Sequence, residues 1–397
     1  MGEQWMGVRE RIERMQERLT ADGYDAYLVT QNIDLYYLTG SMQTGYLFVP
    51  AAGEPVFYVR RSVSRAAQES AVRTEPLGSF RHFGEKLAAE YPDLWTNKQP
   101  VIATEYDVLP VQQFERLKQV IPGAVWRDGS VLMRELRMIK SPEEIELIRQ
   151  SGLLIGEALE HALGLIKVGM TDLELVTEIE YYVRRRGHMG IMRMRGYNQE
   201  IITGMVGSGW AGALPTYFDG PAGGQGLGPA SPQGSGVKPI ARDEPILIDI
   251  GCCVNGYVID QTRTAVIGRL SDELSAAYAV SERILRQTEA ALRPGTVCET
   301  LYAEALATAR EAGLAEHFMG YGDDQVKFLG HGIGLEVDEW PVLARGFQYQ
   351  LQPGMVIAIE PKFTYPGQGV VGIENTYHIT EDGWANLTPF REGVIEL

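Results

Sequence analysis

The spacing of hydrophobic positions predicts that helices and strands alternate through the first third of the chain. An amphipathic helix is predicted at the start by apolar residues at three- and four-residue steps, namely Trp5, Val8, Ile12, Met15 and Leu19. Stretches rich in branched and aromatic residues predict strands at 25–30, 46–49, 56–59 and 101–104. Further helical stretches are expected at 62–70 and 111–120. This alternation is typical of an α/β domain.

Two capping patterns predict helices further along the chain. Ser141 precedes a proline and two acids, which is the pattern of an N-cap with proline at the first helical position. We therefore place a domain boundary just before it, giving domains at 1–138 and 139–397. Thr171 begins a capping-box pattern, so another helix is expected to run to about Arg186. Residues 220–236 are dominated by Gly, Pro, Ser and Gln, which predicts either a flexible surface loop or a loop that folds over a site.

A β-hairpin is predicted around the dipeptide Asn255-Gly256, a strong hairpin turn signal. The flanking strands are 246–251 and 257–266, and with this turn Asp249 faces Thr262. Asp260 then lies diagonally from Asp249 on the same face, at a backbone distance of ~7–8 Å. One such acid is explained by backbone hydrogen bonds or by a pair with Arg263. Two acids on one buried face must share a proton, pair with cations or bind a metal ion.

Three more residues extend this pattern. His331 lies between glycines in 329–334; a lone histidine is more often structural, but imidazole is also a common metal ligand. Glu360 ends the apolar stretch 355–361, and Glu374 lies in the returning stretch 370–377 after a turn at 367–369. Read alone, Glu374 is an exposed strand residue, but its place in a second hairpin of the same design weakens that interpretation. Two Asp, one His and two Glu suit a pair of divalent cations and metal-assisted hydrolysis.

Composition narrows the class of protein. The 397 residues include 52 Asp and Glu against 36 Lys and Arg, a net charge of −16 that argues against a general nucleic-acid binder. The three cysteines exclude a full disulfide framework and fit a reducing compartment. Neither a signal peptide nor an apolar run of the ~20 residues of a membrane helix is found. We therefore expect a soluble, cytoplasmic protein that binds neither nucleic acid nor membrane.

The order and spacing of these motifs resemble the pita-bread metallopeptidases, which include methionine aminopeptidases, Xaa-Pro aminopeptidases and prolidases. The motifs are Asp249-Ile-Gly, Gly256-Tyr257 with Asp260, Gly330-His331-Gly332, Ile359-Glu360-Pro361 and Glu374-Asn375. Residues 32–40 resemble the creatinase-type N-terminal domain of the prolidase branch, and residues 136–145 resemble the linker helix that joins its two domains. The resemblance implies an α/β (α+β) protein with a creatinase-like N-terminal domain and a C-terminal pita-bread domain.

The resemblance also implies a site and an activity. The implied ligands of a dinuclear centre are Asp249, Asp260, His331, Glu360 and Glu374, with Glu360 also the general base. The two divalent ions would be Mn, Co, Zn or Fe, and the branch commonly forms homodimers. The expected function is hydrolysis of short peptides by an Xaa-Pro aminopeptidase or dipeptidase. The alternatives are a non-peptidase member acting on a small amide, amidine or onium compound, as creatinase, ectoine hydrolase and a sulfonium-propionate lyase do, and a binding protein that has lost catalysis.

Three positions depart from the family pattern. Thr216 and Asp338 stand where peptidase members usually have histidines, and Gly372 stands where the prolidase branch often has arginine. The missing histidines are those thought to hold the substrate amide and the tetrahedral intermediate. These departures suggest a retained metal centre with a changed substrate, or local replacement within a peptidase. The candidate substrate-binding residues are Thr216, Tyr217, Tyr257 and Asp338.

Overall fold

A computed structural model describes residues 2–96 and 98–397, with the side chains of residues 2–6 excepted. The side chain of Trp5, part of the first predicted helix, thus lies outside the described residues. The chain divides into two compact units, Met1–Arg137 and Met138–Leu397. Within the described residues, no helix combines the length and apolarity needed to cross a membrane.

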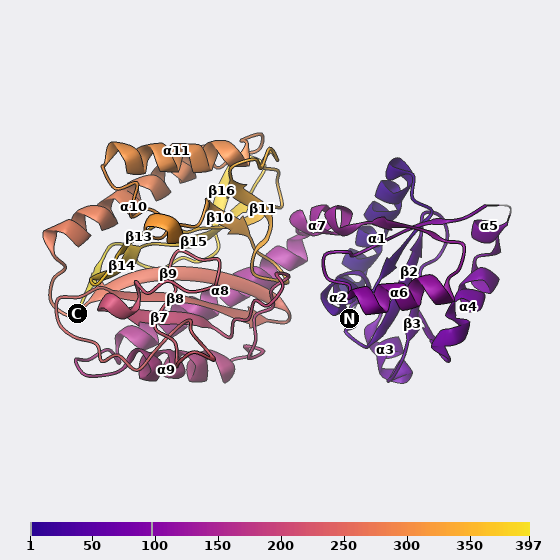
Figure 1. The fold of residues 1–397 in the computed structure, drawn as a ribbon, viewed down its shortest axis with the longest axis horizontal. Coiled ribbons are helices and arrows are strands. Elements are labelled where there is room, and N and C mark those ends of the chain that lie inside the picture. Colours follow the sequence, from indigo (N-terminus) through magenta and orange to yellow (C-terminus); the bar gives the residue numbers. More distant parts are fainter. Residues whose placement is uncertain (1, 97) are drawn as a thin grey trace. The chain divides into compact units, whose positions relative to one another are not determined.

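The first unit is built on a six-stranded sheet of order β4-β3-β2-β1-β5-β6 (Figure 1). Its strands are β1 (Ala26–Val29), β2 (Gly45–Pro50), β3 (Val56–Val59), β4 (Arg73–Pro76), β5 (Val101–Thr104) and β6 (Val125–Asp128). Its helices are α1 (Gly2–Asp22), α2 (Asn32–Thr39), α3 (Val63–Glu69), α4 (Phe83–Glu90), α5 (Pro92–Trp95), α6 (Val111–Val120) and α7 (Ser130–Met138). The predicted strands and helices of this part are confirmed. The prediction missed β4 and β6, which are short and partly exposed and so lack a continuous apolar pattern. It also missed the helices α2, α4, α5 and α7.

The second unit contains three sheets. A four-stranded sheet has the order β17-β9-β8-β7, a five-stranded sheet the order β11-β10-β12-β15-β16, and β13 pairs with β14. The strands are β7 (Gly204–Ser208), β8 (Ile246–Val254), β9 (Tyr257–Val266), β10 (Phe328–Gly332), β11 (Glu339–Ala344), β12 (Val356–Ile359), β13 (Lys362–Tyr365), β14 (Gly369–Gly372), β15 (Asn375–Ile379), β16 (Trp384–Asn386) and β17 (Ile395–Glu396). The helices are α8 (Pro142–Leu163), α9 (Asp172–Arg184), α10 (Asp272–Ala291) and α11 (Cys298–Glu311).

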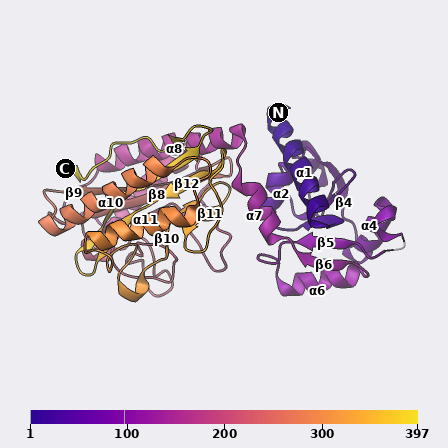
Figure 2. The same ribbon diagram turned by 90° about the horizontal axis from the view of Figure 1, so that it is seen from above.

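Helices cover the outer faces of these sheets. Helices α8 and α9 pack against the four-stranded sheet, and α10 and α11 pack against strands of the other two sheets (Figure 1). Figure 2 shows α10 and α11 side by side over the strands. A cluster of buried apolar residues joins α10 and α11 to the five-stranded sheet. The strands that carry the candidate site are therefore held from both sides by packed helices.

Both predicted helix caps are present, and the predicted N-cap at Ser141 forms a capping box as Thr171 does. The Ser141 and Thr171 side chains each accept a hydrogen bond from the backbone three residues on, and Glu144 and Glu174 bond back to the cap. Residues 136–145 differ from the expected linker helix, because α7 ends at Met138 and α8 begins at Pro142. Proline disfavours a helical conformation in the residue before it, so the helix is interrupted and a new one starts.

The predicted hairpin of β8 and β9 is confirmed in register. Asp249 pairs with Thr262, and Asp260 pairs with Gly251. The turn residues Asn255 and Gly256 both have positive φ, of 51° and 89°. Positive φ at both central residues matches the right-handed twist of the strands, which is why this dipeptide sets the register.

The second predicted hairpin is present but broken in the middle. Strand β12 pairs with β15 in one sheet, whereas β13 pairs with β14 in another. The register is the same on both sides of the break, which places Glu360 opposite Glu374. Glu374 also forms an isolated bridge to Thr262 on β9. At the break, Glu360 and Glu374 of this hairpin therefore face Asp249 and Asp260 of the first hairpin.

Candidate metal centre

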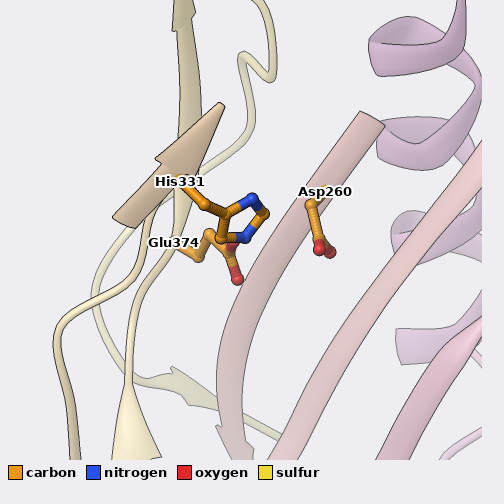
Figure 3. Close-up of side chains that lie close together, drawn as sticks. All are labelled: Asp260, His331 and Glu374. Atoms are coloured by element: carbon orange, nitrogen blue, oxygen red, sulfur yellow. The ribbon is translucent and has the colours of Figure 1, made fainter. Parts of the chain in front are cut away.

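The two hairpins and β10 bring the five predicted ligands together. Asp260, His331 and Glu374 offer ligand atoms within 4.8 Å of one another (Figure 3). The same holds for Asp249, Glu360 and Glu374. His331 and the two glutamates are buried, whereas the two aspartates are half-buried. Residues more than 100 positions apart thus converge on one space, as the sequence predicts.

The first of these groups has the free donor atoms that a divalent cation requires. Thr262 Oγ1 donates to Glu374 Oε2 at 2.7 Å, while Glu374 Oε1 is buried without a hydrogen-bond partner among the described residues. His331 Nδ1 lies 3.0 Å from the carbonyl oxygen of Gly332, which only accepts, so in the neutral imidazole Nδ1 carries the proton and Nε2 has the lone pair. An unpaired carboxylate oxygen, an imidazole nitrogen and Asp260 fit one divalent ion.

Glycines allow β10 to lie close to its neighbours at His331. A Cβ atom at Gly330 would fall 2.2 Å from the carbonyl oxygen of Ala358, and one at Gly332 would fall 2.3 Å from that of Trp340. Any side chain at either position would push the strands apart. The glycines on both sides of His331 therefore allow β10 to pack closely between β11 and β12, and this close packing sets the position of the imidazole.

Lys362 is the residue of this site that the sequence analysis missed. Its ammonium lies 2.5 Å from Glu360 Oε2, 3.0 Å from Glu374 Oε2 and 3.1 Å from Asp249 Oδ2, and the side chain has no exposed surface. The sequence did carry a signal, because residues two apart on a strand share a face. Lys362 comes two residues after Glu360, but the break between β12 and β13 separates the two residues, so this spacing alone did not fix the direction of the lysine.

The Lys362 ammonium and the dense packing of acids shift the pKa values of the site. Burial, followed by the nearby Glu374 and Asp249 charges, raises the pKa of Asp260 well above its usual range. Burial raises the pKa of Glu360 to about 8, with Glu374 and Asp249 adding to the effect and Lys362 opposing it. Burial alone would raise the pKa of Glu374, but Lys362 and then His331 outweigh it, so that pKa is lowered. Glu374 is thus the acid most firmly held as a carboxylate.

Arg263 fixes the backbone that carries Glu374. Its guanidinium is fully buried, and its five donors all bond to oxygen atoms, four of them backbone carbonyls. One of these carbonyls belongs to Glu374, at 2.8 Å, and the side-chain acceptor is Asn375 Oδ1, also at 2.8 Å. One alternative was that Asp249 pairs with Arg263. In the structure Asp249 pairs with Lys362 instead.

A cavity opens onto four of the five predicted ligands and onto one of the four candidate substrate residues; Glu374 does not line it. Asp249, Asp260, His331, Glu360 and Asp338 all line it. Asp338 Oδ1 lies 3.4 Å from His331 Nδ1. Residues 220–223, 233 and 234 of the glycine-rich loop line the same cavity. This agrees with the interpretation that the loop folds over a site.

The other three candidates lie elsewhere. Thr216 and Tyr217 line a neighbouring cavity, which shares residues 218–221 with the first. The Tyr257 hydroxyl donates to Glu144 Oε1 at 3.0 Å, on α8, and Tyr257 lines neither cavity. A substrate contact by Thr216 or Tyr257 stays a prediction, and the geometry favours Asp338.

With this geometry in place, comparison with known proteins defines the class. The model of metallopeptidase family M24 matches residues 146–381, and that of the creatinase/prolidase N-terminal domain matches residues 11–139. An Xaa-Pro dipeptidase of Pyrococcus furiosus is 27% identical over 96% of this chain and 98% of that protein. The prolidase structure from Pyrococcus horikoshii OT3 has a TM-score of 0.80 at 26% identity, covering 97% of this chain and 100% of that chain. The Xaa-Pro dipeptidase structure from Bacillus anthracis has a TM-score of 0.81 at 25% identity, covering 98% and 100%.

The chain therefore belongs to metallopeptidase family M24. It is a hydrolase of the prolidase branch whose reaction depends on divalent metal ions. The predicted fold class, a creatinase-like N-terminal α/β domain followed by a pita-bread domain, is confirmed. The predicted enzyme class is confirmed as well.

Proposed function

We propose that this protein hydrolyses short peptides at the amide bond before a proline residue. The observation that carries the proposal is the convergence of Asp260, His331 and Glu374 beside a cavity that Asp260 and His331 line, with one Glu374 oxygen that has no hydrogen-bond partner among the described residues. The relatives named as Xaa-Pro dipeptidases and prolidases support the choice of peptide. We assign the substrate site to a domain of residues 139–397, preceded by a domain of residues 1–138.

In this proposal Asp260 and Glu374 bind a metal ion together with His331, whereas Glu360 transfers a proton. Asp260, His331 and Glu374 hold a divalent ion, which when bound acidifies a water molecule and polarises the scissile carbonyl. Glu360 lines the cavity and lies 3.6 Å from His331 Nε2, so it is placed to take the proton from the attacking water. Its raised pKa suits this role, because a base with a pKa near the working pH accepts and releases a proton readily.

Two further acidic residues that line the cavity favour a positively charged group on the substrate. Asp219 and Asp338 both line the cavity in addition to the metal-binding acids. Asp338 occupies a position where peptidase relatives usually carry histidine, so a negative charge replaces a neutral or positive group. We propose that this pair attracts the free α-amino group of the peptide.

The test is a substrate panel under defined metal loading. Xaa-Pro dipeptides, longer Xaa-Pro peptides and small amides are each incubated with Mn²⁺-, Co²⁺-, Zn²⁺- or Fe²⁺-loaded enzyme. Hydrolysis of Xaa-Pro dipeptides that is abolished in Asp260→Ala and kept in Asp382→Ala, an exposed acid outside the site, supports the proposal. Hydrolysis of small amides alone would support the non-peptidase alternative instead.

Manganese as the native metal, a homodimer and a cytoplasmic location are part of the same proposal. All three cysteines are free and buried, which is consistent with a reducing compartment. Metal analysis of protein purified without chelator and sedimentation analysis address the metal and the oligomeric state.

A further inference from the structure

We propose that the Lys362 ammonium takes the place of one of the two metal ions, so that the centre holds a single divalent ion. This inference rests on the metal site proposed above and specifies its composition. It starts from the two groups of potential ligands, one built on Asp260 and His331 and the other on Asp249 and Glu360, which share Glu374. Lys362 contacts every member of the second group.

The position of the ammonium leaves no space for an ion in the second group. A divalent ion would have to lie about 2.0–2.6 Å from the same oxygen atoms of Asp249, Glu360 and Glu374. Lys362 Nζ already lies 2.5–3.1 Å from one oxygen of each. An ammonium has three hydrogen-bond donors, and here it meets three carboxylates. Ion and ammonium therefore exclude each other at this point.

The first group remains free for a metal ion. Lys362 contacts Glu374 through Oε2, the same oxygen that accepts from Thr262, and leaves the buried Oε1 without a partner. Neither Asp260 nor His331 has an ion pair with Lys362 among the described residues. The lysine thus divides a site of five ligands into an ammonium half and a metal half.

The absence of a side chain at position 372 belongs to the same arrangement. Lys362 and Gly372 are direct cross-strand partners in β13 and β14. A Cβ atom at Gly372 would fall 2.6 Å from Lys362 Cγ. The arginine that the prolidase branch often has at this position is therefore incompatible with Lys362 as it lies here. A Cβ atom there would also fall 2.7 Å from the carbonyl oxygen of Pro361 and 2.8 Å from Lys362 Cα, so the close pairing of β13 with β14 excludes a side chain at Gly372 together with the lysine.

Metal counting on the purified enzyme tests the proposal. Wild-type protein saturated with Mn²⁺ and freed of excess by gel filtration is expected to hold one ion per chain. Lys362→Ala opens the space between the three carboxylates and is expected to hold two. Lys238→Ala is the matched control, because Lys238 is also buried, with Nζ bonded to Glu244 and Ser208 away from the centre. It should still hold one.

Spectroscopy and crystallography give readouts that do not depend on activity, and the crystallographic readout needs no variant. Isolated Mn²⁺ in the wild type should give a six-line electron paramagnetic resonance signal, and Lys362→Ala should give the signal of a coupled pair. An anomalous map of Mn²⁺-soaked wild-type crystals should show one peak beside Asp260 and His331.

Two ions per chain in the wild type, or a peak between Asp249 and Glu360, would overturn the inference and leave the proposed peptidase function standing. A count that stays at one in a folded Lys362→Ala would also overturn it. No bound ion in the wild type would overturn the metal site itself and this inference with it. One ion without hydrolysis of any peptide would support the inference while refuting the proposed function.

Discussion

Replacing Arg263 by lysine should destabilise the C-terminal unit and weaken metal binding together. Arg263 donates five hydrogen bonds from a fully buried position, whereas a lysine ammonium has only three donors and a different geometry. At least two acceptors therefore lose a bond, and each buried acceptor left unpaired costs about 1–3 kcal/mol. We expect Arg263→Lys to lower the free energy of unfolding by about 2–4 kcal/mol.

The effect reaches the metal centre through the backbone of Glu374. Arg263 bonds to the carbonyl of this residue and to the side chain of Asn375 beside it. Loss of groups that orient metal ligands typically lowers metal affinity by about 10–100-fold, and for a contact through the backbone we expect the lower end, on the order of 10-fold. The destabilisation should appear as a fall in melting temperature of roughly 5–15 °C for a unit of this size.

Two measurements on the full chain check this prediction. Thermal unfolding identifies the C-terminal unit as the transition that moves upward when Mn²⁺ is added, and titration calorimetry gives the Mn²⁺ affinity. Arg283→Lys, at an exposed position on α10, is the matched control and should change the free energy of unfolding by less than about 0.5 kcal/mol. A melting temperature and an Mn²⁺ affinity of Arg263→Lys equal to those of the wild type would refute the reasoning.

Two further predictions concern a glycine and a histidine. Gly372→Ala should lower the free energy of unfolding by about 1–3 kcal/mol, because the new Cβ meets Lys362 Cγ at 2.6 Å. Gly383→Ala is the control, since the space around Gly383 is open, and it should leave the free energy of unfolding in urea nearly unchanged. Burial, followed by the charge of Arg184, lowers the pKa of His188 in the folded protein. The unfolded chain then binds the extra proton first, so wild-type stability should fall relative to His188→Asn as the pH drops below about 6.5.

Each of these has a result that would contradict it. Equal urea midpoints for the Gly372→Ala and Gly383→Ala variants would show that the strands yield easily around Lys362. Parallel stability curves for wild type and His188→Asn between pH 7.5 and 5.5 would show that His188 protonates equally in the folded and unfolded states.

The sequence by itself determined the local structure and most of the ligand set. The Asn255-Gly256 turn and the two-residue period of a strand were enough to place Asp249 opposite Thr262, as observed. Both capping boxes depend only on residues three apart, and both form. The acids in otherwise apolar strands were visible because an unpaired buried carboxylate is costly wherever it occurs.

Tertiary structure alone decided what these acids bind. After Pro361, Lys362 begins a strand that reads as ordinary, and its burial depends on the break that sends β12 and β13 into different sheets. That break is held by long-range contacts, such as the bridge from Glu374 to Thr262. Whether a lysine points to solvent or into three carboxylates is set by the position of strands distant in sequence. The composition that we propose for the centre therefore follows from the fold, although its five candidate ligands were named from the chain.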